Sequence, residues 1–210
     1  LPITGEAQVW RLDATGTGIR SVTWVQPDGQ VRGTADVSAD GTRASLWDMA
    51  LVPGDHWIAV ETRGEDYTLM ITPLGPRAEG AEHEPNNDRG NAEPIELDAP
   101  RTGRVPGPAD TDVYRFSLGT AEQLTIRLDP PAAAALRIAV SSGTQDLARV
   151  REPVPGVPWI HRMALPAGDY EVTVSSDSGS VDPYILAITR EDPFAQVADE
   201  LHSQYLLGFA

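Results

Sequence analysis

The sequence predicts an all-β protein made of two tandem antiparallel β-sandwiches, jelly-roll or immunoglobulin-like, with a short C-terminal helix. Three observations predict this fold class. Short runs of alternating apolar and polar residues recur along the 210 residues, as in strands with one buried face. The 19 glycines and 18 prolines are spread through the chain, so turns must recur often. Similar segments appear in both halves, which indicates an internal repeat.

Nine runs of four or five residues alternate in this way and are expected to be strands. In the first half they are Gln8–Leu12, Ser21–Val25, Trp57–Val60 and Tyr67–Ile71. In the second half they are Val113–Phe116, Leu124–Leu128, Leu136–Val140, Tyr170–Val174 and Tyr184–Ile188. Turn residues such as Pro53-Gly54-Asp55 separate most of the runs. Short strands with frequent turns are typical of a sandwich or jelly roll.

The internal repeat is defined by two pairs of segments. Met49–Asp55 matches Met163–Asp169, and the glycines of this pair lie 114 positions apart. Upstream, Val9–Leu12 matches Val113–Phe116 at a separation of 104 positions. The two separations predict two copies of one sandwich, the second about ten residues longer internally. The alternative is that two unrelated hairpins share a common turn.

The composition divides the chain into three parts. Residues 1–78 are expected to form a degenerate or truncated sandwich, and residues 79–192 a complete one. Leu74–Asn91 is rich in glycine, proline, asparagine and acidic residues, so we interpret it as the linker between the modules. In residues 193–210 the apolar side chains follow helical spacing from Phe194 to Leu201, which predicts a helical tail or the start of another element.

The charge of the chain excludes several classes of partner. The formal net charge is −15, and all sixteen cationic residues are arginine. Binding of nucleic acid needs a cationic surface, so we expect none. An acidic surface favours a monomer and attracts cations. No apolar run approaches the roughly 20 residues of a membrane helix, so the chain is not expected to be membrane-embedded.

Catalytic motifs are not found in the sequence. There is no cysteine, no G-x-S-x-G and no H-E-x-x-H, and the four histidines lie outside recognisable motifs. His56 and His161 lie on or beside expected strands, where a core or surface role is expected. The sequence therefore predicts no enzyme and no catalytic residues.

The acidic stretch Glu82–Asp88 is the strongest functional feature. It lies between the two copies of the repeat, so we interpret it as the module junction and as a calcium site. Calcium takes six to eight oxygen ligands with loose geometry, and carboxylates and amide carbonyls supply them. Binding would also order a segment that is too polar to order itself.

Four ordered elements resemble bacterial pre-peptidase C-terminal domains, which are secreted jelly-roll modules of about a hundred residues. They are Glu84–Asp88, Gly103–Val105, Asp110–Phe116, and the late strand with Leu165, Gly168 and Tyr170. The resemblance covers roughly residues 82 to 190. The first copy resembles the family only in its later strands, with Glu6 and Gln8 where the second copy has the two aspartates of Asp110-Thr111-Asp112.

The resemblance implies a set of calcium ligands, because some members of the family bind calcium through the acidic linker and the D-x-D loop. Carried over by position, the ligands are Glu82, Glu84, Asn86, Asn87, Asp110 and Asp112. The alternative is that the two aspartates flank a turn while the two asparagines cap the first strand. The set exists only in the second copy, so we expect at most one site and little contribution from the first module.

The end of the chain carries a second, shorter resemblance. Residues 197–209 are similar to a segment near the end of some bacterial von Willebrand factor A-related proteins, which implies an adhesion or surface protein as the parent. The chain begins at Leu1 and ends at Ala210, and we expect it to be a fragment or processed piece of a longer protein.

The leading hypothesis is a non-catalytic, extracytoplasmic binding, targeting or spacer module of a larger secreted, periplasmic or surface protein. Its only expected cofactor is calcium, and a protein or polysaccharide is its expected class of partner. The alternative is a carbohydrate- or protein-binding adhesin; a row of exposed tryptophans and tyrosines on one sheet would favour sugar binding. A third reading is an accessory fragment of a secreted hydrolase.

Overall fold

The computed structural model describes residues 2–3, 8–26, 29–64, 66–82, 84–108, 110–150 and 154–191. Within these ranges the chain contains eighteen strands and no helix, so the all-β prediction is confirmed. No helix in the described part could cross a membrane. The predicted C-terminal helix, at residues 193–210, lies outside the described residues.

The first nine strands form what we call the N-terminal unit. Its strands are β1 (Pro2–Ile3), β2 (Gln8–Gly16), β3 (Ile19–Val25), β4 (Val31–Thr34), β5 (Asp36–Val37), β6 (Arg43–Leu51), β7 (Gly54–Asp55), β8 (Trp57–Thr62) and β9 (Tyr67–Gly75). Two antiparallel sheets have the orders β5-β6-β2-β9 and β4-β3-β8, and β1 pairs with β7. All strands expected in this half of the sequence are present.

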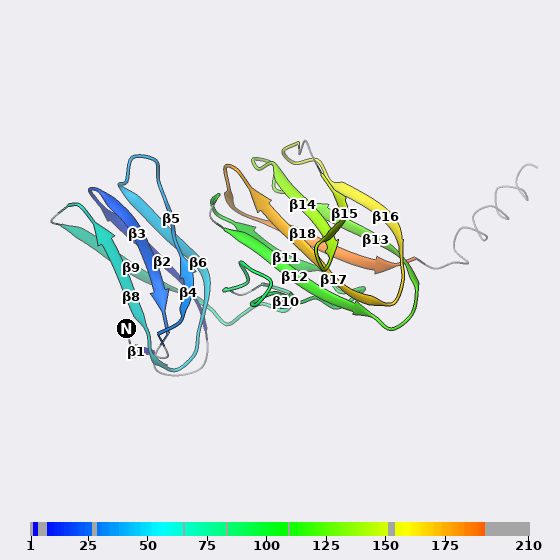
Figure 1. The fold of residues 1–210 in the computed structure, drawn as a ribbon. Coiled ribbons are helices and arrows are strands. Elements are labelled where there is room, and N and C mark those ends of the chain that lie inside the picture. The colour runs from blue at the N-terminus through cyan, green and yellow to red at the C-terminus, as the bar shows by residue number, and fades with distance from the viewer. Residues whose placement is uncertain are drawn as a thin grey trace, which may run out of the picture.

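The remaining strands form the C-terminal unit. They are β10 (Glu93–Pro94), β11 (Arg101–Val105), β12 (Thr111–Leu118), β13 (Glu122–Asp129), β14 (Leu136–Ser142), β15 (Gln145–Arg149), β16 (Trp159–Leu165), β17 (Gly168–Ser176) and β18 (Ser180–Arg190). The sheet orders are β10-β12-β17-β14-β15 and β11-β18-β13-β16, with β10 parallel to β12. Figure 1 shows the two units side by side, blue to cyan and green to orange.

Each unit encloses a hydrophobic core of its own. Period-two alternation places one face of every long strand inward, as in β13, where Leu124, Ile126 and Leu128 are buried between exposed or half-buried neighbours. The core of the N-terminal unit includes Leu12 and Trp24, and it shares no residue with the core of the C-terminal unit. The described strands therefore pack as two β-sandwiches.

Strand pairing relates the two units, and the separation is 114 positions along β2 and β6. Gln8 pairs with Leu51, and Glu122 pairs with Leu165, so β2 corresponds to β13 and β6 to β16 at 114 positions. β13 also pairs with β18, as β2 does with β9. On the other sheet, β14 pairs with β15 and β17, as β3 does with β4 and β8.

The match of Val9–Leu12 to Val113–Phe116, at a separation of 104 positions, is therefore wrong. Val9–Leu12 lies on β2, which pairs with β6 and β9, whereas Val113–Phe116 lies on β12, which pairs with β10 and β17. A short alternating segment fits any strand with one buried face, so its letters alone do not identify its neighbours. The comparison of Glu6 and Gln8 with the two aspartates is wrong for the same reason.

The turn that follows β6 and β16 is closed in the same way in both units. The Tyr170 hydroxyl donates to the Pro166 carbonyl at 2.7 Å. At the corresponding position His56 is 1% exposed; its Nδ1 accepts from Trp24 Nε1 at 3.1 Å, so its Nε2 donates to the Val52 carbonyl at 2.9 Å. His56 is therefore a core residue that bonds the buried Trp24 N–H and the carbonyl of the exposed Val52, whereas His161 lies half-buried on the edge strand β16.

We predict that His56→Leu lowers the free energy of unfolding by about 1–3 kcal/mol, because the Trp24 N–H and the Val52 carbonyl lose their partner. Urea denaturation followed by tryptophan fluorescence measures the change. The matched control, His161→Leu on an edge strand, should stay within about 0.5 kcal/mol of the parent. Equal losses in the two variants would contradict this role for His56.

A candidate metal centre at the junction of the two units

Three carboxylates converge where the C-terminal unit begins. One oxygen of each of Glu84, Asp110 and Asp112 lies within 4.8 Å of the other two. Asp112, on β12, is fully buried opposite Val174 of β17. Glu84 is 8% exposed and belongs to the segment between β9 and β10. The expected linker and the D-x-D loop therefore meet in space.

Backbone hydrogen bonds fix the acidic segment from both sides. The Asn86 carbonyl accepts from the Val113 amide of β12 at 2.9 Å, and the Glu82 amide donates to the Thr102 carbonyl of β11 at 2.9 Å. The Glu84 amide donates to the Asp48 carbonyl of β6 at 3.1 Å. Glu82, Glu84 and Asn86 are thus tied to both units, and the expected linker is buried at these residues and is not a solvated tether there.

Two asparagine side-chain amides lie against the carboxylates, and either the oxygen or the NH₂ group of each amide can face them. The Asn86 amide oxygen lies 3.2 Å from both Asp112 Oδ1 and Glu84 Oε1. The Asn87 amide oxygen lies 3.2 Å from Glu84 Oε2, 3.0 Å from Asp110 Oδ1 and 3.1 Å from the Thr111 carbonyl. Oxygens this close repel one another unless a cation lies among them or the amides rotate to present their NH₂ groups as donors.

The oxygen set fits a calcium ion. Two ligands about 2.4 Å from one ion and at roughly right angles to each other are about 3.4 Å apart, close to the observed separations. Three carboxylates, two amide oxygens and the Thr111 carbonyl supply six donors, the lower end of the calcium range. The adjoining cavity has a volume of about 20 Å³, which suits one small species and not an organic ligand.

Glu82 has a different role from the other predicted ligands. Its Oε1 accepts from the Arg104 amide, and its Oε2 accepts from the Tyr114 hydroxyl at 2.9 Å. The Tyr184 hydroxyl lies 2.7 Å from that of Tyr114 and donates to Asp112 Oδ2 at 2.6 Å. Glu82 thus supports the hydroxyls that orient Asp112, one layer behind the converging oxygens.

Gly103 allows this second layer to pack closely. A Cβ atom at Gly103 would collide with the Tyr184 hydroxyl and with Glu82 Oε2. The glycine of the Gly103–Val105 motif is therefore required for close approach and not for an unusual backbone conformation.

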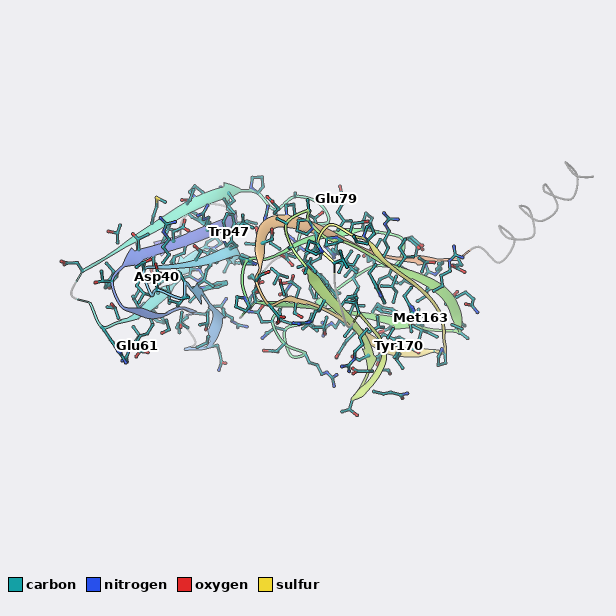
Figure 2. All side chains as sticks on the ribbon, turned by 90° about the horizontal axis from the view of Figure 1, so that it is seen from above. Asp40, Trp47, Glu61, Glu79, Met163 and Tyr170 are labelled. Atoms are coloured by element: carbon teal, nitrogen blue, oxygen red, sulfur yellow. The ribbon has the colours of Figure 1, made fainter. Side chains whose placement is uncertain are left out.

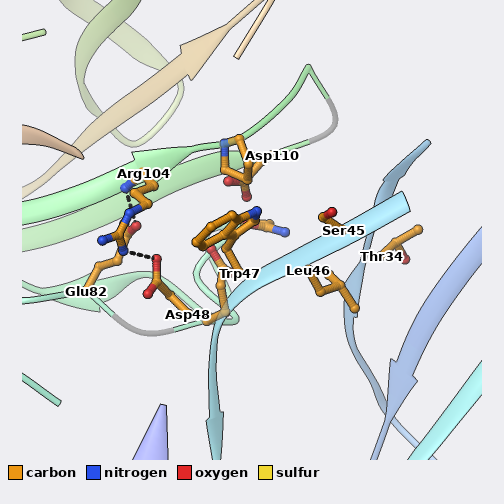
Figure 3. A pocket seen from close by; sticks show the side chains of 11 residues that line it. Thr34, Ser45, Leu46, Trp47, Asp48, Glu82, Arg104 and Asp110 are labelled. Carbon is orange, nitrogen blue, oxygen red and sulfur yellow. Dashed lines mark hydrogen bonds and ion pairs between the residues drawn. The ribbon is translucent and has the colours of Figure 1, made fainter. Parts of the chain in front are cut away.

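The N-terminal unit contacts the residues around the site through Asp48 and Trp47. The pairing of β2 with β6 shifts between Trp10 and Leu12, so Trp47 and Asp48 together oppose Arg11 in a β-bulge. Asp48 adopts a positive φ of 51° and directs its carboxylate to Arg104 Nη1 at 2.6 Å. Figure 3 shows Trp47 and Asp48 beside Glu82 and Arg104 in the pocket, and Figure 2 places Trp47 where the units meet.

Sequence reasoning missed Asp48 and Trp47, because nothing in their local pattern marks a bulge. The Arg11 guanidinium lies 4.0 Å from the centroid of the Trp47 ring, and the Arg104 guanidinium lies 5.8 Å from it. The ring therefore has a cation–π contact with one arginine from each unit. Long-range pairing and not local sequence places these side chains.

Negative charge accumulates in this buried region. Burial raises the pKa of Glu82 from 4.5 to about 7. Burial, and then the neighbouring carboxylates, raise the pKa values of Glu84 and Asp112 well above their usual range. Without a cation, the site must therefore hold protons near neutral pH; a bound divalent ion would replace them.

Among the six predicted ligands, the structure brings five together: Glu84, Asn86, Asn87, Asp110 and Asp112. Glu82 lies beside them and is occupied by protein donors. Their assignment as calcium ligands remains a prediction. The alternative role for Asn86 and Asn87, as a cap for the first strand, stays a prediction as well, because amides turned the other way would donate their NH₂ groups to the same carboxylates.

Comparisons with known proteins give limited information. No family model and no curated protein matches the chain. Among solved structures, the chain is similar to the pre-peptidase C-terminal domain of a collagenase from Bacillus anthracis, with 19% identity and a TM-score of 0.41. The match covers 46% of this chain and 93% of that domain. A TM-score of this size does not establish a common fold.

We predict that Gly103→Ala lowers the free energy of unfolding by about 1–3 kcal/mol, because the new methyl group displaces Tyr184 and Glu82. Chemical denaturation measures the loss. Gly119→Ala is the matched control, since a Cβ there meets nothing within 4 Å. An unchanged free energy of unfolding in Gly103→Ala would show that the second layer is not closely packed.

The raised pKa values predict how stability depends on pH in a chelator. The folded state holds protons that the unfolded chain releases above about pH 4.5, so the stability that these groups contribute is greatest below that pH. It should fall as the pH rises through about 7. Urea denaturation with EDTA between pH 5 and 8 measures this slope, and Glu84→Gln should reduce it. A rise in stability over this range would contradict the prediction.

Proposed function

We propose that this chain is a calcium-stabilised, non-catalytic binding, targeting or spacer module of a larger secreted or surface protein. The observation that carries the proposal is the convergence of three buried or half-buried carboxylates and two asparagine amides where the C-terminal unit begins. Glu84, Asn86, Asn87, Asp110 and Asp112 would hold the ion, with the Thr111 carbonyl as a further donor. Calcium would supply the positive charge that balances the three carboxylates among these five side chains.

The order of strands supports a jelly-roll assignment for the C-terminal unit. Numbered from β11 to β18 in sequence, its sheets have the orders 1-8-3-6 and 2-7-4-5, the arrangement of an eight-stranded jelly roll. Together with the ordered motifs at Glu84–Asp88, Gly103–Val105 and Asp110–Phe116, this order supports the resemblance to pre-peptidase C-terminal domains. The domain division at residues 78 and 192 belongs to the same proposal.

Calcium at this position would fix the junction. Glu84 supplies both a proposed ligand and the backbone amide that pairs with Asp48 of β6. An ion on its carboxylate would therefore restrain the contact between the units as well as the start of β12. Extracellular modules bind calcium with dissociation constants of about 10⁻⁴–10⁻³ M, a range suited to an extracytoplasmic location.

The distribution of tryptophans does not favour the carbohydrate-binding alternative. Trp24 is 1% exposed in the core, Trp57 is 52% exposed on β8, and Trp47 lies beneath Arg11. Trp159, in the C-terminal unit, stacks on His161. These rings do not form a row on one sheet, which a sugar-binding platform would need.

Thermal unfolding with millimolar calcium and with EDTA tests the proposal. Calcium at about 10 mM, roughly 10–100 times a dissociation constant in the range of 10⁻⁴–10⁻³ M, should add about 1.4–2.7 kcal/mol of stability. Asp112→Asn should abolish the calcium-dependent shift, whereas Asp129→Asn, at an exposed ion pair with Arg127 on the same unit, should keep it.

Terbium luminescence gives a second readout at the site itself. Tyr184 donates to Asp112 and contacts Tyr114, so excitation of tyrosine should sensitise a terbium ion bound there. Calcium should compete with the signal, and Asp112→Asn should remove it. An unchanged melting temperature in millimolar calcium together with no terbium signal would refute the calcium site.

A further inference from the structure

Two strands of the N-terminal unit each have one side without a strand partner. Among the described residues, β8 pairs only with β3 and β9 pairs only with β2. Their counterparts are interior strands, because β17 lies between β12 and β14 and β18 lies between β11 and β13. The N-terminal unit thus repeats the pairing of the C-terminal unit from β13 onward, without full counterparts of β11 and β12.

The short strand β1 marks where the counterpart of β12 would end. Pro2 and Ile3 pair antiparallel with Asp55 and Gly54. In the C-terminal unit, Ser117 and Leu118 pair antiparallel with Asp169 and Gly168. Ile3 is 5% exposed and Leu118 is 6% exposed, so both fill the same place at the end of a core. β1 therefore corresponds to the last two residues of β12.

Exposure along the two edges shows what the absent strands would cover. None of the residues of β8 and β9 is buried, although Ile58, Val60, Leu69 and Ile71 face the core. Their counterparts Val172, Val174, Leu186 and Ile188 are fully buried. Tyr67 is 46% exposed, whereas its counterpart Tyr184 is 1% exposed beneath β11. Figure 1 shows β8 and β9 on the side of the N-terminal unit remote from the C-terminal unit.

We propose that the open sides of β8 and β9 are acceptor edges for two antiparallel strands, and that both strands belong to polypeptide joined to the amino side of Pro2. The strand beside β8 would continue β1, and the strand beside β9 would precede it, as β11 precedes β12. Unpaired backbone N–H and C=O groups along an edge bind an added strand through main-chain hydrogen bonds.

The internal comparison also defines the chemistry of the added strands. Residues 101–118 occupy the corresponding edges and bury Val105, Tyr114, Phe116 and Leu118 at alternating positions. The added polypeptide should therefore carry alternating apolar residues and a loop between two short strands. Continuity with β1 favours this segment over a second copy of the chain, whose β11 and β12 are already paired within their own unit.

Hydrogen exchange measured by mass spectrometry tests the proposal. A longer form of the protein, with the residues that its gene encodes ahead of Leu1, should be compared with the chain of residues 1–210. We expect exchange in β8 and β9 to slow by roughly tenfold or more in the longer protein, while β17 and β18 remain unchanged. The comparison should hold in calcium and in EDTA, since these edges lie apart from the junction.

A pair of substitutions in the longer protein sharpens the test. Ile3→Asp should return the exchange of β8 to the level of residues 1–210, because it removes the apolar anchor of β1. Val31→Asp, at a 59% exposed position on the opposite edge of the same sheet, should leave the protection intact. Equal exchange of β8 and β9 in the two proteins would overturn the proposal. Protection that depends on the concentration of residues 1–210, or a gene that encodes nothing ahead of Leu1, would also overturn it.

Discussion

The concentration of carboxylates in a buried region is the constraint on which the rest of this structure depends. Glu84, Asp110 and Asp112 cannot all be ionised there without a counter-charge, because desolvation and mutual repulsion both oppose it. Protons or a cation must supply that charge. The choice between them sets the orientation of the Asn86 and Asn87 amides and the strength with which the acidic segment holds β12 in place.

The same segment connects the two units. Along the segment, backbone hydrogen bonds join it to β11, then to β6 and then to β12. The β-bulge at Asp48 directs the Asp48 carboxylate toward Arg104. An event at the oxygen cluster is therefore coupled to the contact between the units through Glu84. A connection of this kind differs from a flexible linker, because its polar groups are buried and bonded.

The two units share one plan and differ in completeness. The constant separation of 114 positions along β2, β6 and the following turn extends even to the hydrogen bond that closes the turn, where His56 and Tyr170 use different chemistry for the same purpose. The N-terminal unit lacks strands beside β8 and β9, and its inward residues there are only half-buried. The core of the N-terminal unit is thus only partly covered at β8 and β9.

By itself, the sequence determined the all-β class, the nine expected strands and the members of the acidic cluster, because alternation and oxygen-rich side chains are local properties. It did not reveal the strands β6 and β16, the bulge at Asp48 or the role of Glu82 behind the cluster. Strand neighbours depend on non-local hydrogen bonds, so the match of Val9–Leu12 to Val113–Phe116 was wrong while the turn at Gly54 and Gly168 gave the correct separation. Only the tertiary structure brought Asp48 to Arg104 and left the edges of β8 and β9 open, because both follow from which strands pair and not from what any one strand contains.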